Sequence, residues 1–222
     1  MSHWSAENAT RAYLRTIKMG KRGKEPDVAE FISALAGGNN AQFMVEVCGS
    51  IAGPTTLGLV AAAQQTGGRV VCILPGSTEL QASKSQLSRY LDHVEFVIGD
   101  PLDLLTNQFK SADFVTIDCN IDGHEVIFKT AQKERIQGKG GALVVGYNAQ
   151  HLVPSCNELG GHFLPIGEGL LISKVPKNHG IRDYNGNGLN TKRSKWVVKV
   201  DKCTGEEHVF RVTSPQQKII QA

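Results

Sequence analysis

The stretch that decides the fold runs from Gln42 to Gln65 and reads QFMVEVCGSIAGPTTLGLVAAAQQ. An apolar run at 43–47 carries one acid, Glu46, and a turn of small residues follows at 48–53. Pro54 then opens a segment rich in leucine, valine and alanine, which predicts a buried helix. Strand, small-residue loop and helix in this order form the opening unit of a nucleotide-binding α/β sheet, where a ligand lies over the helix N-terminus.

The same alternation continues along the chain. Short apolar strands separated by helices are typical of a parallel sheet covered on both faces, and right-handed crossovers make such a sheet doubly wound. The further strands are expected at 69–74, 94–98, 113–118 and 142–145. The helices are expected at 78–90, 102–108 and 125–137, with two more before the sheet at 5–18 and 26–36.

The pattern changes after residue 147. Two apolar runs around a Gly-Glu-Gly turn at 167–169 predict an antiparallel hairpin. We expect residues 1–175 to form one domain that includes the N-terminal helices. Residues 176–193 are then predicted to be a flexible polar loop, and residues 194–213 a second β-hairpin packed on the same domain.

Composition limits the class of protein. A chain of 222 residues suits one α/β domain, and its net charge of +3 is too small and too dispersed to indicate a nucleic-acid partner. No apolar run approaches the roughly 20 residues that a membrane span needs. Five well-separated cysteines without a C-x-x-C pair favour buried, reduced thiols over disulfides or zinc ligands. The expected location is therefore the cytoplasm or the nucleus.

Several segments resemble class I S-adenosylmethionine-dependent methyltransferases, most of all the caffeoyl-CoA O-methyltransferase branch. The resemblance is carried, in chain order, by EVCGSIAG, VVCIL, FVIGDPLDLL, DFVTIDCN, GGALVVGYN and FLPIGEGLLISKV. Closer still, WSAENATRAYL, EPDVAEFISALA and LPIGEGLL resemble a plant family of unknown function that is grouped with those methyltransferases by fold. The resemblance implies a Rossmann-like, doubly wound, mostly parallel sheet of seven strands, with N-terminal helices and an extra C-terminal β-hairpin.

The resemblance also implies a site for S-adenosylmethionine or S-adenosylhomocysteine. Glu46 matches the acid before the family's glycine-rich loop, where glycine lets the backbone approach the ligand. The glycine positions of that loop hold Cys48, Ser50 and Ala52. At the end of the second strand, the acid that would bind the ribose hydroxyls is replaced by Leu74, and the first acid, Glu79, comes five residues late.

Two later positions match the family better. Asp100 fits the acid that meets the adenine amine, and Asp118 fits the aspartate near the transferred methyl group and the metal. The residues expected to line the cofactor cleft are therefore Glu46, Gly49, Ser50, Gly53, Asp100 and Asp118.

The resemblance does not extend to the metal ligands. In metal-dependent relatives an Asp-Asn pair after the fifth strand completes the metal site, but here Gly146 and Tyr147 occupy those positions and Asn148 comes one residue late. A hard divalent ion requires several oxygen ligands, so we expect no bound metal. His124 is a candidate base and Cys119 a candidate nucleophile, with a surface histidine and a buried structural thiol as the alternatives.

Two functions stay open at this point. The first is a methyltransferase-like protein that transfers a methyl group to an oxygen of a small molecule, as a homodimer and with a degenerate cofactor loop. The second is a non-catalytic regulatory or scaffold protein on the same fold. A different nucleotide ligand is a third alternative, because Rossmann sheets serve many functions.

Overall fold

The computed structural model describes residues 4–20, 27–137, 141–155, 158–175, 194–200 and 207–213. The chain divides into two compact units, Met1–Gly180 and Ile181–Ala222. Among the described residues, no helix combines the length and apolar character that crossing a membrane requires.

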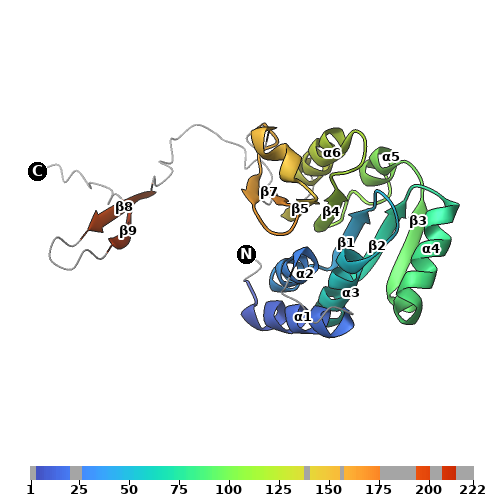
Figure 1. Ribbon diagram of the computed structural model, residues 1–222. Coiled ribbons are helices and arrows are strands. Elements are labelled where there is room, and N and C mark those ends of the chain that lie inside the picture. Colours follow the sequence, from blue (N-terminus) through green and yellow to red (C-terminus); the bar gives the residue numbers. More distant parts are fainter. Residues whose placement is uncertain are drawn as a thin grey trace, which may run out of the picture. The chain divides into compact units, whose positions relative to one another are not determined.

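The first unit contains a seven-stranded sheet with the strand order β3-β2-β1-β4-β5-β7-β6 (Figure 1). Strands β1 to β5 pair in parallel, and β7 and β6 are added in antiparallel pairing at one edge. The strands are β1 Phe43–Val47, β2 Arg69–Leu74, β3 Val94–Ile98, β4 Phe114–Asp118, β5 Ala142–Tyr147, β6 His162–Leu164 and β7 Leu170–Val175. The strand order reverses between β1 and β4, and open α/β sheets bind ligands at such a switch point.

Helices cover both faces of this sheet. Alternate residues of β1 belong to different cores: Val45 and Val47 pack in the core that includes α5 and α6, whereas Met44 packs in the core beneath α1, α2 and α3. The helices are α1 Ala6–Met19, α2 Val28–Gly38, α3 Pro54–Thr66, α4 Ser77–Leu87, α5 Pro101–Thr106 and α6 His124–Gln137, with short 3-10 helices η1 Ser88–His93 and η2 Gln150–Ser155. The expected fold class, a doubly wound and mostly parallel sheet with N-terminal helices, is confirmed.

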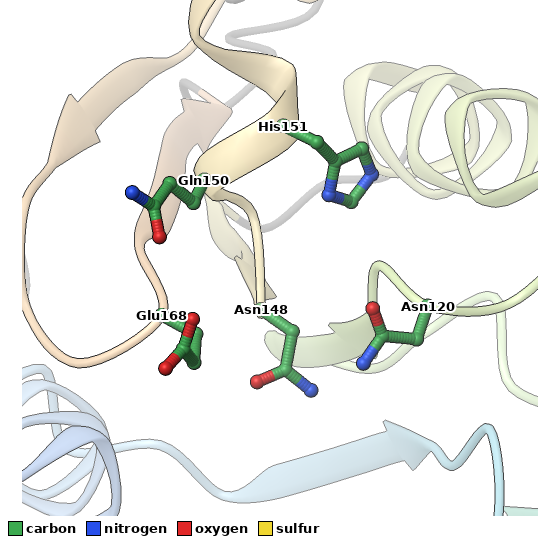
Figure 2. Close-up of a pocket in the computed structure, with 5 residues that line it drawn as sticks. All are labelled: Asn120, Asn148, Gln150, His151 and Glu168. Carbon is green, nitrogen blue, oxygen red and sulfur yellow. The ribbon is translucent and has the colours of Figure 1, made fainter.

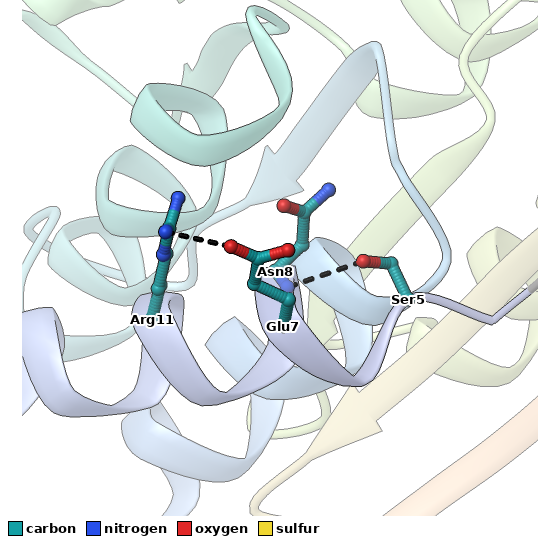
Figure 3. Close-up of polar contacts among 4 residues, drawn as sticks. All are labelled: Ser5, Glu7, Asn8 and Arg11. Atoms are coloured by element: carbon teal, nitrogen blue, oxygen red, sulfur yellow. Dashed lines mark hydrogen bonds and ion pairs between the residues drawn. The ribbon is translucent and has the colours of Figure 1, made fainter.

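Side-chain caps fix where the N-terminal helices begin. The Ser5 hydroxyl accepts a hydrogen bond of 3.2 Å from the backbone N–H of Asn8, and Glu7 forms an ion pair of 2.6 Å with Arg11 one turn later (Figure 3). Helix α2 begins with a capping box, in which the Asp27 backbone N–H donates to Glu30 Oε2 over 2.9 Å. The start of α1 predicted at Ser5 is confirmed.

The described residues of the second unit form an antiparallel hairpin, β8 (Ser194–Val200) with β9 (Glu207–Thr213). The extra C-terminal hairpin is thus present as expected. Its packing on the sheet domain stays a prediction, and the loop expected at 176–193 lies outside the described residues.

Candidate functional site

The loop between β1 and α3 has a buried inner part and an exposed tip. Gly49, Ser50 and Ile51 are exposed, while the residues on either side of them are buried. On the inner part, the Ala52 backbone N–H donates to the Ser83 hydroxyl of α4 over 2.9 Å, and the Gly53 N–H donates to Thr56 Oγ1 over 3.1 Å. Because these inner amides already have partners, the tip at 49–51 is the part of the loop that a ligand can reach.

The loop tip lies against Asp118 at the end of β4. A Cβ atom placed on Gly49 would be 2.8 Å from Asp118 Oδ2 and 3.1 Å from Ile121 Cγ1, so glycine permits this close approach. Asp118 is only 8% exposed, and its Oδ1 accepts hydrogen bonds from the Asn120 backbone N–H at 3.1 Å and from Asn148 Nδ2 at 2.8 Å. The structure therefore brings together two of the residues expected at the cofactor cleft, Gly49 and Asp118.

Glu46 lies beneath the loop rather than on its surface. Its side chain is 1% exposed, and its Oε2 accepts a hydrogen bond of 2.6 Å from Thr56 Oγ1. The Tyr147 hydroxyl donates to Oε1 over 3.3 Å. Burial raises the pKa of Glu46 to about 7, against the lowering effect of its hydrogen bonds with Thr56, Cys72 and Tyr147. In this position Glu46 supports the loop through Thr56, and its direct contact with a cofactor stays a prediction.

The other expected cofactor residues are spread along the same edge of the sheet. Asp100 is exposed after β3, where its Oδ1 caps α5 by accepting from the Leu102 N–H over 3.1 Å. Strand β2 separates β3 from β1. Gly53 is buried at the start of α3, and a Cβ there would lie 3.3 Å from Gln86 Nε2 of α4. Ser50 remains on the exposed tip.

The carboxylate of Glu79, in the first turn of α4, lies close to the end of β2. The Glu79 carboxylate folds back over Gly76, since a Cβ on Gly76 would lie 2.8 Å from Glu79 Oε2. Gly76 is two residues beyond Leu74, the last residue of β2. In the sequence, Glu79 comes five residues too late for a ribose-binding acid. The first turn of α4 nevertheless brings its carboxylate close to the end of β2, where that acid would lie.

A polar pocket of about 530 Å³ lies beside Asp118. Figure 2 shows the side chains that line it, which come from the segments after β4 and β5 and from the turn before β7. They are Asn120, Asn148, Gln150, His151 and Glu168. Asn148 has a φ of 57°, in the left-handed region that asparagine tolerates better than most residues.

His151, rather than the candidate base His124, is the histidine that lines this pocket. The Nδ1 of His124 is 2.8 Å from the Ile121 carbonyl oxygen, so its ring is fixed to the backbone. The His151 ring packs edge-on against it with 5.1 Å between ring centroids. Cys119 is a buried thiol whose pKa burial raises to about 12, which matches a structural thiol rather than a nucleophile.

The residues present do not fit the divalent metal of related enzymes. Asp118 Oδ1 already accepts two hydrogen bonds, and the amide of Asn148 turns a donor nitrogen toward it. A hard cation requires several oxygen ligands directed at one point. Asp118 and Asn148 as placed here therefore do not form a site for a hard divalent ion.

Solved structures of methyltransferases share this fold. The O-methyltransferase TomG from Streptomyces achromogenes, in complex with S-adenosylmethionine, has a TM-score of 0.54 at 18% identity over 78% of this chain and 91% of its own. An O-methyltransferase from Bacillus cereus in complex with S-adenosylhomocysteine has 0.53 at 17% identity over 78% and 92%. A Staphylococcus aureus protein, provisionally assigned as a caffeoyl-CoA O-methyltransferase, has 0.52 at 19% identity over 78% and 93%. At these identities the likeness shows the fold.

Comparison of sequences gives the family. No curated protein matches the chain. One family model, described as "Protein of unknown function (DUF1442)", matches residues 2–212 and thus nearly the whole length. The chain belongs to this family, and its fold is that of the class I O-methyltransferases.

Proposed function

We propose that this protein binds S-adenosylmethionine and transfers its methyl group to an oxygen of a small, neutral, hydroxylated molecule. The observation that carries the proposal is the polar pocket beside Asp118, at the switch point of a methyltransferase sheet. Two residues that line the pocket, Asn120 and Asn148, also donate hydrogen bonds to Asp118. Structural neighbours that hold the cofactor or its product support the choice of ligand.

The exposed tip of the β1–α3 loop and the carboxylates at the ends of β2 and β3 would receive the cofactor. Glu79 has the chemistry to bind ribose hydroxyls, and Asp100 to accept from the adenine amine. Among the described residues, the acceptor pocket is lined by three amides, one imidazole and one carboxylate, and none of these is a lysine or arginine. Such a lining favours a neutral acceptor that donates and accepts hydrogen bonds over an anionic one.

Catalysis would come from positioning and from one base. The amides would hold the acceptor hydroxyl in line with the methyl group, which is the main contribution available to a site without a metal. His151 would take the hydroxyl proton, as imidazole is suited to do near neutral pH. His124 orients His151 through the edge-on contact of the two rings.

A second function, a non-catalytic regulatory or scaffold protein on this fold, is favoured by the close approach of Gly49 to Asp118. This approach narrows the space between the loop and the end of β4 in which a cofactor would lie. In that case the buried loop amides and the buried Glu46 serve only to hold the loop in place.

A methyl-transfer assay with labelled cofactor and a panel of phenols and polyols tests the proposal. We expect labelled product with the natural chain, a loss of about 100-fold or more in His151→Gln, and no product in Asp118→Ala. His162→Gln is the matched control, because His162 is exposed on β6 and does not line the pocket. Bound cofactor with no product from any acceptor would favour the non-catalytic function instead.

A further inference from the structure

Three side chains of types that can bind a metal ion lie close together beneath the loop after β1. Glu46 and Cys48 are two residues apart and so point to the same face of the sheet, and Cys72 of β2 is the register partner of Glu46. One ligand atom from each lies within 4.8 Å of the other two, and all three side chains are buried. Glu46 Oε2 and Cys72 Sγ are 3.5 Å apart.

Among the described residues, no cationic side chain is a partner of the Glu46 carboxyl group. The ionisable groups that act on Glu46 are Cys72, Tyr147 and Asp118, all of which are acids. Thiol and carboxyl groups that lie this close together can bind a cation once they release their protons.

We propose that Glu46, Cys48 and Cys72 bind one zinc ion. Thiolate sulfur together with a carboxylate oxygen is a ligand set that zinc accepts, usually in tetrahedral geometry. With zinc bonds of about 2.3 Å to sulfur and about 2.0 Å to oxygen, a sulfur and an oxygen ligand at the tetrahedral angle lie about 3.5 Å apart. The separation of Glu46 Oε2 and Cys72 Sγ has this value without any movement. Three protein ligands leave the fourth position to water.

The surroundings supply support and access. Thr56 Oγ1 donates to Glu46 Oε2 over 2.6 Å, which orients the carboxylate as outer partners of metal ligands do. Cys48 is 5% exposed and precedes the exposed Gly49, so the cluster lies directly beneath the loop tip. Zinc at this point would join β1, β2 and the cofactor loop. No spacing in the sequence indicates this site, because Cys48 follows β1 whereas Cys72 lies in β2. The proposal departs from the expectation that the cysteines are reduced thiols rather than zinc ligands.

The test uses the full chain, stripped with chelator, loaded with zinc, dialysed and analysed for metal. We expect about one zinc per chain, and a loss of affinity of about 100-fold or more in Cys48→Ser and in Cys72→Ser. Cys119→Ser is the matched control, since Cys119 is a buried thiol outside the cluster. The double variant Cys156→Ser, Cys203→Ser must also keep its zinc, which assigns the ion to the cluster.

Cobalt(II) substitution of the natural chain gives a second readout that needs no variant. Cobalt bound by two thiolates gives strong thiolate-to-metal absorption, and its binding releases protons that calorimetry in different buffers can count. The proposal is overturned if the natural chain keeps no zinc and shows no cobalt–thiolate absorption. It is also overturned if both cluster variants keep zinc, or if the double variant loses it.

Discussion

As the pH rises from 4.5 to about 7, the natural chain is expected to lose about 3 kcal/mol of unfolding free energy that the Glu46→Gln variant keeps. In the unfolded chain the carboxyl group loses its proton near the lower value, whereas burial keeps it protonated in the folded chain up to the higher one. Between these values the native state binds more protons, so the natural chain loses stability with rising pH. Above the window the difference is constant, because both states are ionised.

Urea unfolding of both chains at a series of pH values, with chelator present, measures this difference. Glutamine keeps the shape of the side chain and an oxygen that can accept from Thr56, so the comparison isolates the charge. Glu95→Gln is the control, because Glu95 is exposed on β3 and its ion pair of 3.7 Å with Arg69 is an exposed one, which contributes little to stability. A pH-independent difference between Glu46→Gln and the natural chain would show that Glu46 is not held protonated in the fold.

Phe114→Ala is expected to lower the free energy of unfolding by about 3–5 kcal/mol. Phe114 is fully buried at the start of β4, where its register partners are Met44 of β1 and Leu143 of β5. Removing the ring leaves a cavity in the core beneath the N-terminal helices. Because whole domains are stable by only about 5–15 kcal/mol, the variant should lie near the limit of folding.

Urea unfolding measures this loss as well. Val126→Ala is the control: this side chain is 56% exposed on α6, and its truncation should change stability by no more than about 0.5 kcal/mol. A loss below about 1 kcal/mol in Phe114→Ala would show that the ring is not packed as the structure has it.

The fold could be predicted from the sequence because the strands are short runs rich in apolar residues, and the central strands β1 and β4 are buried along their whole length. Such runs predicted β2 and β3 at the bounds they have, Arg69–Leu74 and Val94–Ile98. The predicted ends of elements were less accurate where tertiary contacts determine them. The helix expected to reach residue 90 ends at Leu87, where η1 begins, and η2 was not anticipated.

The site could be predicted only in part. Asp118 was expected at a strand end, where ligands of such sheets lie, and it borders the pocket. Glu46 was expected in the cleft; the alternation along β1 places its side chain beneath the loop, and its contact with the cofactor stays a prediction. No pattern in the sequence indicates that Gln150 and His151 line the pocket. Their place there depends on η2 and on the antiparallel pairing of β5 with β7.

In the proposed function, the exposed loop tip and the nearby carboxylates bind the cofactor. Isothermal titration calorimetry of the purified protein with S-adenosylhomocysteine tests it most directly. We predict a dissociation constant in the micromolar range, roughly −8 kcal/mol, that weakens by about tenfold or more in Asp100→Ala. Asp103→Ala, a change at an exposed acid of the same helix, should leave binding unchanged. No heat and no thermal shift at millimolar ligand would mean that the cleft is closed and would contradict the account.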